Sequence, residues 1–405
     1  MKSPWNRREF IARPLALLAA SSLLSKSELL HAATPASSTA AGGIVQRTLG
    51  RTGIQLPVVS MGVMNANMPA VVKRAYEMGI RHFDTAARYQ DGRNEEMVGQ
   101  VIKELGVRDK VTIATKAWIH PSKRMEAGAK EQIRSIFEGS LKRLQMDHVD
   151  ILYFHAIDSA DEARSEFAIQ VLNDLKKEGK TRFIGLSTHT HQEQVLNEAV
   201  KAGAYDVALV GINYTMAANK GLLDAIDNAA KKGMGIVAMK TQAGGTTKPD
   251  PKLPSVLPPH SQTALLKWVL QNPSITTAVP GFTNFDQLEQ NFSVARDLAF
   301  TPAEKEFLAD KSFRAQAEFC VQCGKCREDC PLRAEIPTLM RSHMYAVQYA
   351  NRGLARETLA SIGSGKGLDA CASCASCRAN CRETVNIARK IAELKAITAA
   401  GVLEA

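Results

Sequence analysis

The sequence has no run of like charges, no apolar stretch long enough to span a bilayer as a mature helix, and no cysteine before position 320. The formal net charge of the 405 residues is +10, but basic and acidic side chains are interspersed, which favours a solvated surface. We therefore expect no nucleic-acid partner and no stable membrane span in the mature protein. The absence of early cysteines argues against an exported domain stapled by disulfides.

The first residues form a basic and apolar leader. Arg7 and Arg8 precede an apolar run over residues 14–24, which is too short to span a bilayer, and small residues follow. Paired arginines in this place are similar to those of the twin-arginine export signal. We predict a signal peptide over residues 1–36, a small-residue linker over residues 37–43 and a periplasmic protein. An amphipathic or disordered start is the alternative.

After a predicted hairpin over residues 44–57, short apolar segments alternate with amphipathic ones. The predicted strands are Val58 to Val63, Ile80 to Phe83, Val111 to Thr115, Val149 to Phe154, Arg182 to Leu186, Val207 to Ile212, Gly235 to Met239 and Thr276 to Val279. Repeated strand–helix units favour parallel pairing with the helices outside. Polar residues at several strand ends favour a closed (β/α)8 TIM barrel over a doubly wound sheet. We predict this barrel over residues 44–313.

Four polar side chains end or follow predicted strands, where a parallel barrel places its catalytic groups. Asp84 opens a loop that contains Tyr89, while Lys116 and His155 follow the next two strands. Tyrosine is a useful general acid only when its pKa is lowered, and a nearby ammonium lowers it by favouring phenolate. Singly, each residue has an ordinary explanation, such as a core histidine or a charge at a strand end.

Together these residues resemble the Asp, Tyr, Lys, His tetrad of the aldo-keto reductases. The resemblance implies that Tyr89 donates a proton to a carbonyl oxygen while hydride reaches the carbon. It implies that Lys116 lowers the pKa of Tyr89 and is held by Asp84. It assigns His155 to orienting the carbonyl. The expected activity is therefore an oxidoreductase that interconverts a small-molecule carbonyl and an alcohol.

The resemblance also implies a site for NADP(H) or NAD(H). The matching residues are Gly62, Ser187, Thr188, Met239, Lys240, Gly281, Asn284, Gln287 and Asn291. Gly281 and Gln287 stand where the family commonly has a Lys and an Arg that hold the 2′-phosphate. Losing such charge-assisted hydrogen bonds weakens discrimination for NADP, so the choice between the two nucleotides stays open.

All eight cysteines form two runs with the same spacing, C-x2-C-x2-C-x3-C. The runs are Cys320, Cys323, Cys326 and Cys330, and then Cys371, Cys374, Cys377 and Cys381. This spacing is typical of bacterial ferredoxins with two [4Fe-4S] clusters, in which the fourth cysteine of each run binds the other cluster. We therefore assign Cys381 to the cluster of the first run and Cys330 to that of the second. Zinc is the alternative, although zinc pairs usually come as two separated C-x2-C units.

The cysteine runs predict a small, mainly helical ferredoxin-like domain over residues 314–405, with a helix over residues 338–354. Haem attachment is excluded because neither run contains C-x2-C-H. A barrel followed by such a domain resembles the iron-sulfur branch of the aldo-keto reductases.

Clusters carry single electrons, whereas a nicotinamide carries a hydride. We therefore expect electrons to pass between the substrate and an external electron carrier, relayed through the two clusters. Because free nicotinamide is scarce outside the cytoplasm, the nucleotide is expected to stay tightly bound. The alternative is an exported iron-sulfur electron-transfer or partner-binding protein whose barrel has lost nucleotide binding. It is motivated by Thr188, Leu209, Gly281 and Gln287.

Overall fold

The structure, a computed structural model, describes residues 37–39, 43–243, 258, 260–310, 318–374 and 376–403. The predicted signal peptide at residues 1–36 lies outside these ranges and stays a prediction. Within the described ranges, no helix combines the length and the apolar character needed to cross a membrane.

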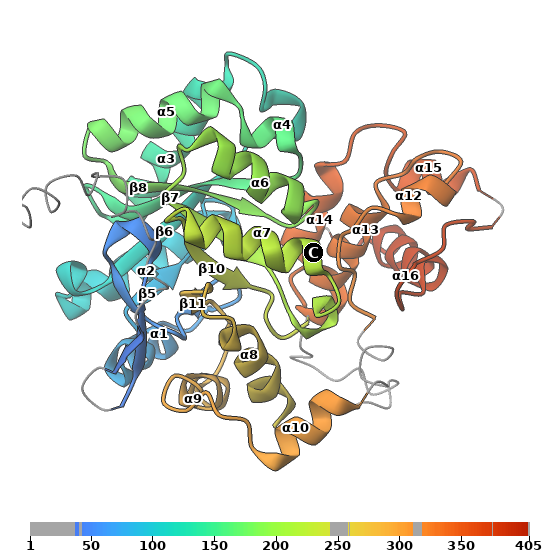
Figure 1. Cartoon of the computed structure of the whole chain (residues 1–405). Coiled ribbons are helices and arrows are strands. Elements are labelled where there is room, and N and C mark those ends of the chain that lie inside the picture. Colours follow the sequence, from blue (N-terminus) through green and yellow to red (C-terminus); the bar gives the residue numbers. More distant parts are fainter. Residues whose placement is uncertain are drawn as a thin grey trace, which may run out of the picture. The chain divides into compact units, whose positions relative to one another are not determined.

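Eight parallel strands form the central sheet, which confirms the predicted barrel (Figure 1). They are β4 (Met61–Gly62), β5 (His82–Asp84), β6 (Thr112–Ala117), β7 (Val149–Ile157), β8 (Thr181–Thr188), β9 (Val207–Gly211), β10 (Gly235–Met239) and β11 (Thr277–Ala278). Each strand pairs with its neighbours in chain order. Two parallel bridges, Val59 with Ala278 and Gly62 with Gly281, join the first and last strands. The sheet is therefore nearly closed into a barrel.

Helices cover the outside of the strands, as the amphipathic segments predict (Figure 1). They are α1 (Pro69–Met78), α2 (Arg93–Leu105), α3 (Ala129–Leu144), α4 (Ala160–Ala163), α5 (Glu166–Lys177), α6 (Gln192–Ala202), α7 (Lys220–Lys231), α8 (Ser261–Gln271), α9 (Phe285–Ser293) and α10 (Pro302–Ala309). Their apolar faces and the outward side chains of the strands form the main core. This arrangement leaves the carboxyl ends of the strands free to carry the site.

A small antiparallel sheet closes the other end of the barrel. Strands β2 (Val45–Thr48) and β3 (Gln55–Pro57) form the predicted hairpin, and its residues Leu49 and Leu56 are fully buried among apolar side chains inside the barrel. The linker predicted at residues 37–43 is partly wrong, because β1 (Ser37–Thr39) pairs with β2. Backbone hydrogen bonds to β2 extend the hairpin into that segment.

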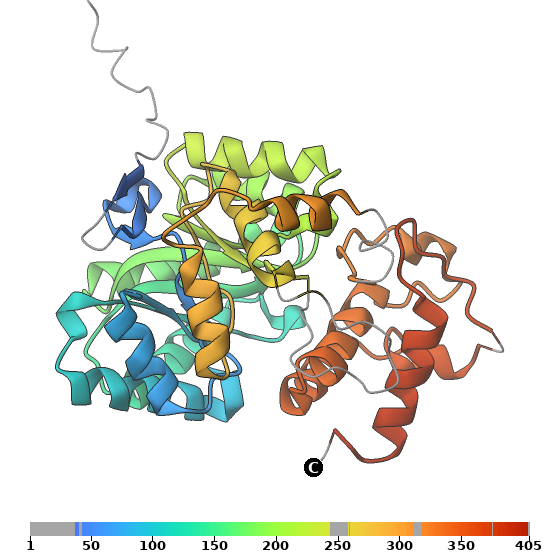
Figure 2. The ribbon, with the colours of Figure 1, turned by 90° about the horizontal axis from the view of Figure 1, so that it is seen from below.

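The C-terminal region is mainly helical. Its helices are α12 (Cys326–Asp329), α13 (Ile336–His343), α14 (Arg352–Ala360), α15 (Leu368–Ala372) and α16 (Ile387–Ala399), and α13 packs against both α14 and α16 (Figure 2). Residues 338–354, which we predict to be helical, are helical except for a break between the two helices at residues 349–351. A π-helical turn (Met344–Gln348) follows α13, and Ala350 has a φ of +49°, which ends the helical path before α14 begins.

The hairpin gives a test of the barrel closure. Gly50 has a φ of +49°, and a Cβ atom there would lie 2.3 Å from the backbone nitrogen of Gly235. Gly53 also has a positive φ, +72°, but a Cβ atom there meets nothing within 4 Å. We expect Gly50→Ala to lower the free energy of unfolding by about 2–4 kcal/mol and the control Gly53→Ala by about 1 kcal/mol. Denaturant unfolding followed by circular dichroism measures both, and equal losses would contradict the close packing of the hairpin against β10.

Candidate active site

The ends of β5 and β6 bring together a lysine–aspartate ion pair. Asp84 ends β5, and the parallel register of the two strands brings Lys116 of β6 close to it. Lys116 Nζ donates hydrogen bonds to Asp84 Oδ1 and to the Thr85 carbonyl, both at 2.5 Å. The two charged side chains are only 1% and 5% exposed. Removing either partner would therefore leave an uncompensated buried charge.

Two residues at the start of α2 fasten the loop that follows Asp84. Asn94 accepts a hydrogen bond from Thr85 Oγ1 at 2.6 Å and donates to the Val63 carbonyl at 2.7 Å. Glu95 accepts a hydrogen bond from Thr115, on the strand that carries the lysine. Since both α2 residues are fully buried, they hold the loop and β6 at a fixed distance.

Tyr89 follows this loop and faces His155 of β7. The two ring centroids are 6.2 Å apart and the ring planes are nearly perpendicular, at 85°. Lys116 Nζ lies 5.0 Å from the centroid of the Tyr89 ring. Asp84, Tyr89 and His155 line one cavity, so the structure brings the four predicted tetrad residues together.

Burial largely determines the protonation states of Tyr89 and His155. Burial, and then the negative charge of Asp84, raises the pKa of Tyr89 well above its ordinary value. Burial and the Asp84 charge dominate this pKa in the structure, so the expected lowering of the Tyr89 pKa by Lys116 stays a prediction. Burial, and then the charge of Lys116, holds the pKa of His155 well below its ordinary value. At neutral pH, Tyr89 therefore keeps a proton that it can donate, and His155 is an uncharged imidazole.

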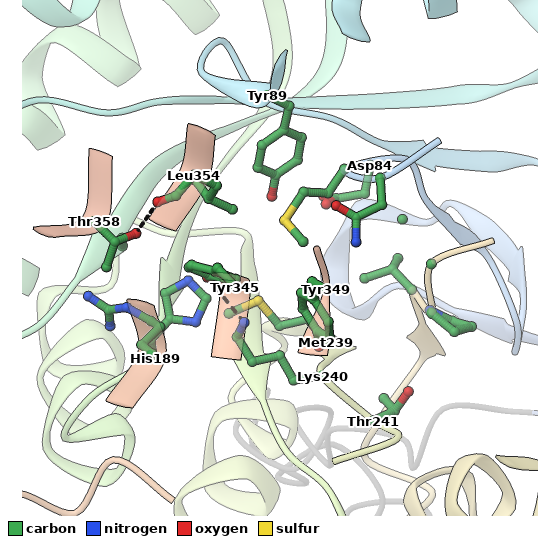
Figure 3. A pocket seen from close by; sticks show the side chains of 18 of the residues that line it. Asp84, Tyr89, His189, Met239, Lys240, Thr241, Tyr345, Tyr349, Leu354 and Thr358 are labelled. Atoms are coloured by element: carbon green, nitrogen blue, oxygen red, sulfur yellow. Dashed lines mark hydrogen bonds between the residues drawn. The ribbon is translucent and has the colours of Figure 1, made fainter. Parts of the chain in front are cut away.

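The cavity has a volume of ≈ 340 Å³ and takes its wall from both regions of the chain. Figure 3 shows Asp84 and Tyr89 entering from the barrel, while Tyr345 and Tyr349 enter from the C-terminal region. Leu354 of α14 also lines it. The C-terminal helices therefore cover part of the barrel mouth.

Polar contacts hold these helices against the barrel. Arg88 pairs with Glu357 of α14 at 2.5 Å, and its guanidinium lies 4.0 Å from the centroid of the Trp118 ring. Asn351, which caps α14, donates a hydrogen bond to Asn65 at 2.9 Å. The complete cavity therefore requires both regions to be folded.

The predicted nucleotide residues fall into two groups. Six of them line the cavity, namely Gly62, Met239, Lys240, Gly281, Gln287 and Asn291. The other three, Ser187, Thr188 and Asn284, do not line the cavity. Asn284 caps α9 by accepting a hydrogen bond from the Gln287 backbone nitrogen at 2.9 Å. The Ser187 hydroxyl accepts from a backbone N–H of β7 at 2.8 Å, and Thr188 donates to the Thr190 carbonyl at 3.0 Å, so protein groups already engage both.

The first three cysteines of the first run lie close to the last cysteine of the second run. Cys320, Cys323, Cys326 and Cys381 line one small cavity. Burial, with smaller contributions from the charges of Cys326, Cys323 and Cys381, raises the pKa of Cys320 to about 12. This proximity matches the crossed assignment of Cys381.

The first three cysteines of the second run lie close to Cys330, the fourth cysteine of the first run. Burial raises the pKa of Cys371, and the negative charges of Cys330, Cys377 and Cys374 add to this rise. Within the described part of the chain, no group of three or more His, Cys, Asp or Glu side chains is close enough to share a single metal ion.

Sequence reasoning missed three side chains of the cavity, Arg341, Tyr345 and Tyr349. They lie on α13 and the turn that follows it, far along the chain from the barrel strands, and they belong to no spaced motif. The sequence signal for these side chains was the aromatic pair of Tyr345 and Tyr349, which are four residues apart. Such a pair on a helix more often forms a core face than a site.

Comparison with known proteins identifies the two regions. An eight-stranded parallel barrel with a tyrosine, a histidine and a buried ion pair at its carboxyl edge defines a class of barrel oxidoreductases. The profile of the Aldo/keto reductase family matches residues 62–254, and that of the 4Fe-4S dicluster domain matches residues 316–385. The chain belongs to the aldo/keto reductase family, is an oxidoreductase, and carries a 4Fe-4S dicluster domain.

Several known proteins align with about two thirds of this chain. L-galactose dehydrogenase of Arabidopsis thaliana is 30% identical over 304 residues, which is 65% of this chain and 92% of that protein. L-glyceraldehyde 3-phosphate reductase of Escherichia coli (strain K12) is 24% identical, over 65% of this chain and 91% of that protein. Among solved structures, the holo form of aldo-keto reductase AKR11C1 from Bacillus halodurans superposes with a TM-score of 0.53 at 21% identity, over 65% of this chain and 94% of its own. An aldo-keto reductase from Klebsiella pneumoniae in complex with NADPH has a TM-score of 0.51 at 22% identity, over 64% and 92%. These likenesses show the shared barrel fold.

The ion pair gives a stability test. Lys116→Met removes the ammonium and leaves the Asp84 carboxylate buried without its partner. We expect the free energy of unfolding to fall by about 3–5 kcal/mol. The double variant Lys116→Met with Asp84→Asn removes both charges and should recover most of this loss. Denaturant unfolding measures the two, and a double variant no more stable than the single one would show that the charge of Asp84 is not the cause.

Proposed function

We propose that the protein reduces a carbonyl to an alcohol, or runs the reverse reaction, with Tyr89 as the proton-transfer group. One observation carries this proposal: Tyr89 and His155 meet at one cavity beside the buried pair of Lys116 and Asp84. The names of the relatives, a galactose dehydrogenase and a glyceraldehyde 3-phosphate reductase, support a carbonyl or alcohol substrate.

Each residue has one task in this mechanism. Tyr89 donates its phenolic proton to the carbonyl oxygen as negative charge develops there. His155, as a neutral imidazole, offers a nitrogen to orient the same oxygen, and its Nδ1 has no hydrogen-bond partner among the described residues. Lys116, held by Asp84, places a positive charge behind the Tyr89 ring and favours the phenolate left after proton transfer.

A nicotinamide nucleotide fits the barrel side of the cavity in part. Gly62, Met239, Gly281, Gln287 and Asn291 form a wall along which it could lie. The methionine is polarizable and can pack on a flat ring. When bound, the nucleotide would supply or accept the hydride. Ser187 and Thr188 would have to give up their present hydrogen bonds to reach its carboxamide.

Two [4Fe-4S] clusters are proposed for the crossed cysteine sets. Cys320, Cys323, Cys326 and Cys381 would hold one, and Cys371, Cys374, Cys377 and Cys330 the other. When bound, such clusters exchange single electrons with an external carrier. A smaller cavity lined by both Lys240 and Cys320 supports exchange between the barrel and the first set.

Tyr89→Phe tests the mechanism because it removes the proton and keeps the ring. We expect turnover of glyceraldehyde, with NADPH or reduced methyl viologen as the electron source, to fall at least about 100-fold. Circular dichroism and iron content should not change. Tyr153→Phe is the matched control, since the buried Tyr153 hydroxyl has no hydrogen-bond partner among the described residues. Turnover of Tyr89→Phe near the wild-type rate would refute the assignment.

Single cysteine variants test the crossed clusters. Cys320→Ala and Cys381→Ala should perturb the same electron paramagnetic resonance signal of the reduced protein. Cys330→Ala should instead perturb the signal that Cys371→Ala perturbs. Each variant should retain about half of the iron. If Cys381→Ala behaves like Cys371→Ala, each run binds its own cluster and the crossing is wrong.

A further inference from the structure

Lys240 occupies an unusual place at the edge of the cavity. It directly follows β10 and has a φ of +57°, in the left-handed region that favours glycine. Its Nζ lies 3.1 Å from the Tyr345 hydroxyl, 4.5 Å from the centroid of the Tyr345 ring and 5.6 Å from that of Tyr349. The C-terminal region therefore fixes the position of a barrel ammonium.

Tyr345 belongs to the π-helical turn (Met344–Gln348) and is only 5% exposed. Helical segments of this kind are rare and often occur at functional sites. In Figure 3, Lys240 and Tyr345 lie together at the cavity, with His189 nearby. The turn thus serves to bring a phenol to the lysine rather than to continue α13.

The other basic side chains that line the cavity have carboxylate partners. Arg88 pairs with Glu357 at 2.5 Å and Arg124 with Glu162 at 2.8 Å. Arg341 of α13 lies 3.8 Å from an oxygen of Asp158, and it also contacts the Thr190 hydroxyl at 3.3 Å. Behind the wall, Lys116 is neutralised by Asp84.

No acidic side chain in the described ranges pairs with Lys240. Its charge is met by one hydroxyl and by the faces of two aromatic rings, which stabilise a cation without neutralising it. Among the described residues that line the cavity, Lys240 is thus the one ammonium without a carboxylate partner, and burial lowers its pKa.

Titratable groups around Lys240 respond to its charge. Burial tends to raise the pKa of Tyr345, but the charges of Lys240, Arg341 and Arg88 outweigh it, and the pKa lies below its ordinary value. Burial, and then Lys240 and Arg341, holds the pKa of His189 well below its ordinary value. Groups on both regions of the chain thus experience a positive potential.

We propose that Lys240, with Tyr345 and Arg341 beside it, receives an oxygen anion of the substrate. The protein then acts on carbonyl compounds that also carry a carboxylate or a phosphate. This inference rests on the proposed carbonyl chemistry of Tyr89 and names its substrate class.

An anion suits this position for two physical reasons. An ammonium has three donors, and the Tyr345 hydroxyl engages one of them, which leaves donors for a ligand. Hydrogen bonds between ionised partners are about twice as strong as neutral ones, and the low dielectric of a partly buried cavity strengthens them further. A neutral substrate would leave the charge of Lys240 uncompensated.

The experiment compares substrates that share a carbonyl and differ in charge. One pair is succinic semialdehyde and butyraldehyde, and the other is glyceraldehyde 3-phosphate and glyceraldehyde. The measured quantity is the ratio of kcat/KM for the charged substrate to that for the neutral one. We expect the full-length protein with its clusters to prefer the charged member of at least one pair. Lys240→Met should lower that ratio at least about tenfold, and Lys240→Arg should retain most of it.

The ratio separates a substrate anion from the phosphates of a nucleotide. If Lys240 instead holds the nucleotide, Lys240→Met lowers kcat/KM for both substrates equally and leaves the ratio unchanged, which overturns the inference. A wild-type ratio near one in both pairs overturns it as well. Absence of turnover with all four substrates contradicts the proposed carbonyl chemistry and, with it, this inference. Tyr153→Phe, which removes no charge and a buried hydroxyl without a hydrogen-bond partner among the described residues, should keep the wild-type ratio.

Discussion

The buried ion pair of Lys116 and Asp84 is the constraint on which the site depends. Two charges at 2.5 Å in a nearly water-free interior are tolerable only if their geometry is good and the remaining donors are satisfied. The Thr85 carbonyl accepts a second hydrogen bond from Lys116, and the α2 residues Asn94 and Glu95 hold the neighbouring loop and β6 in place. The pair therefore fixes the ends of β5 and β6 and the loop that presents the tyrosine. The same ion pair therefore supports the proposed catalysis and stabilises the fold.

The cavity is a joint product of two regions with different architectures. The barrel contributes the proposed proton-transfer groups, whereas the C-terminal region contributes Tyr345 and Arg341 and closes part of the mouth. Contacts such as Arg88 with Glu357 link the regions beside the cavity rather than at a distance from it. Tyr345 and Arg341 lie outside residues 62–254, which match the aldo/keto reductase profile, so substrate selection by this chain can depend on side chains beyond that match. Substrate binding and electron exchange would then both take place where the barrel meets the C-terminal region.

Much of the fold follows from the sequence because its signals are local. Apolar runs mark the strands, and polar residues at their ends mark the carboxyl edge, which is how Asp84, Tyr89, Lys116 and His155 can be found. Regular cysteine spacing marks the C-terminal domain in the same way. The predictions that the structure corrects concern features that depend on tertiary contacts. The break after α13 arises from a π-helical turn. The hydroxyls of Ser187 and Thr188 form hydrogen bonds with neighbouring backbone groups. The approach of Tyr345 to Lys240 joins residues 105 positions apart, and no local pattern encodes it.

The crossed grouping of the cysteines has a consequence for how the protein is made. Because Cys381 stands with Cys320, Cys323 and Cys326, the first set is incomplete until almost the whole chain has left the ribosome. The barrel, by contrast, contains all its strands by residue 278. Synthesis therefore imposes an order in which the barrel can close first and its metal-binding cover is finished last. A chain truncated between residues 377 and 381 would retain the proposed proton-transfer groups and all four cysteines of the second set, but the first set would lack Cys381.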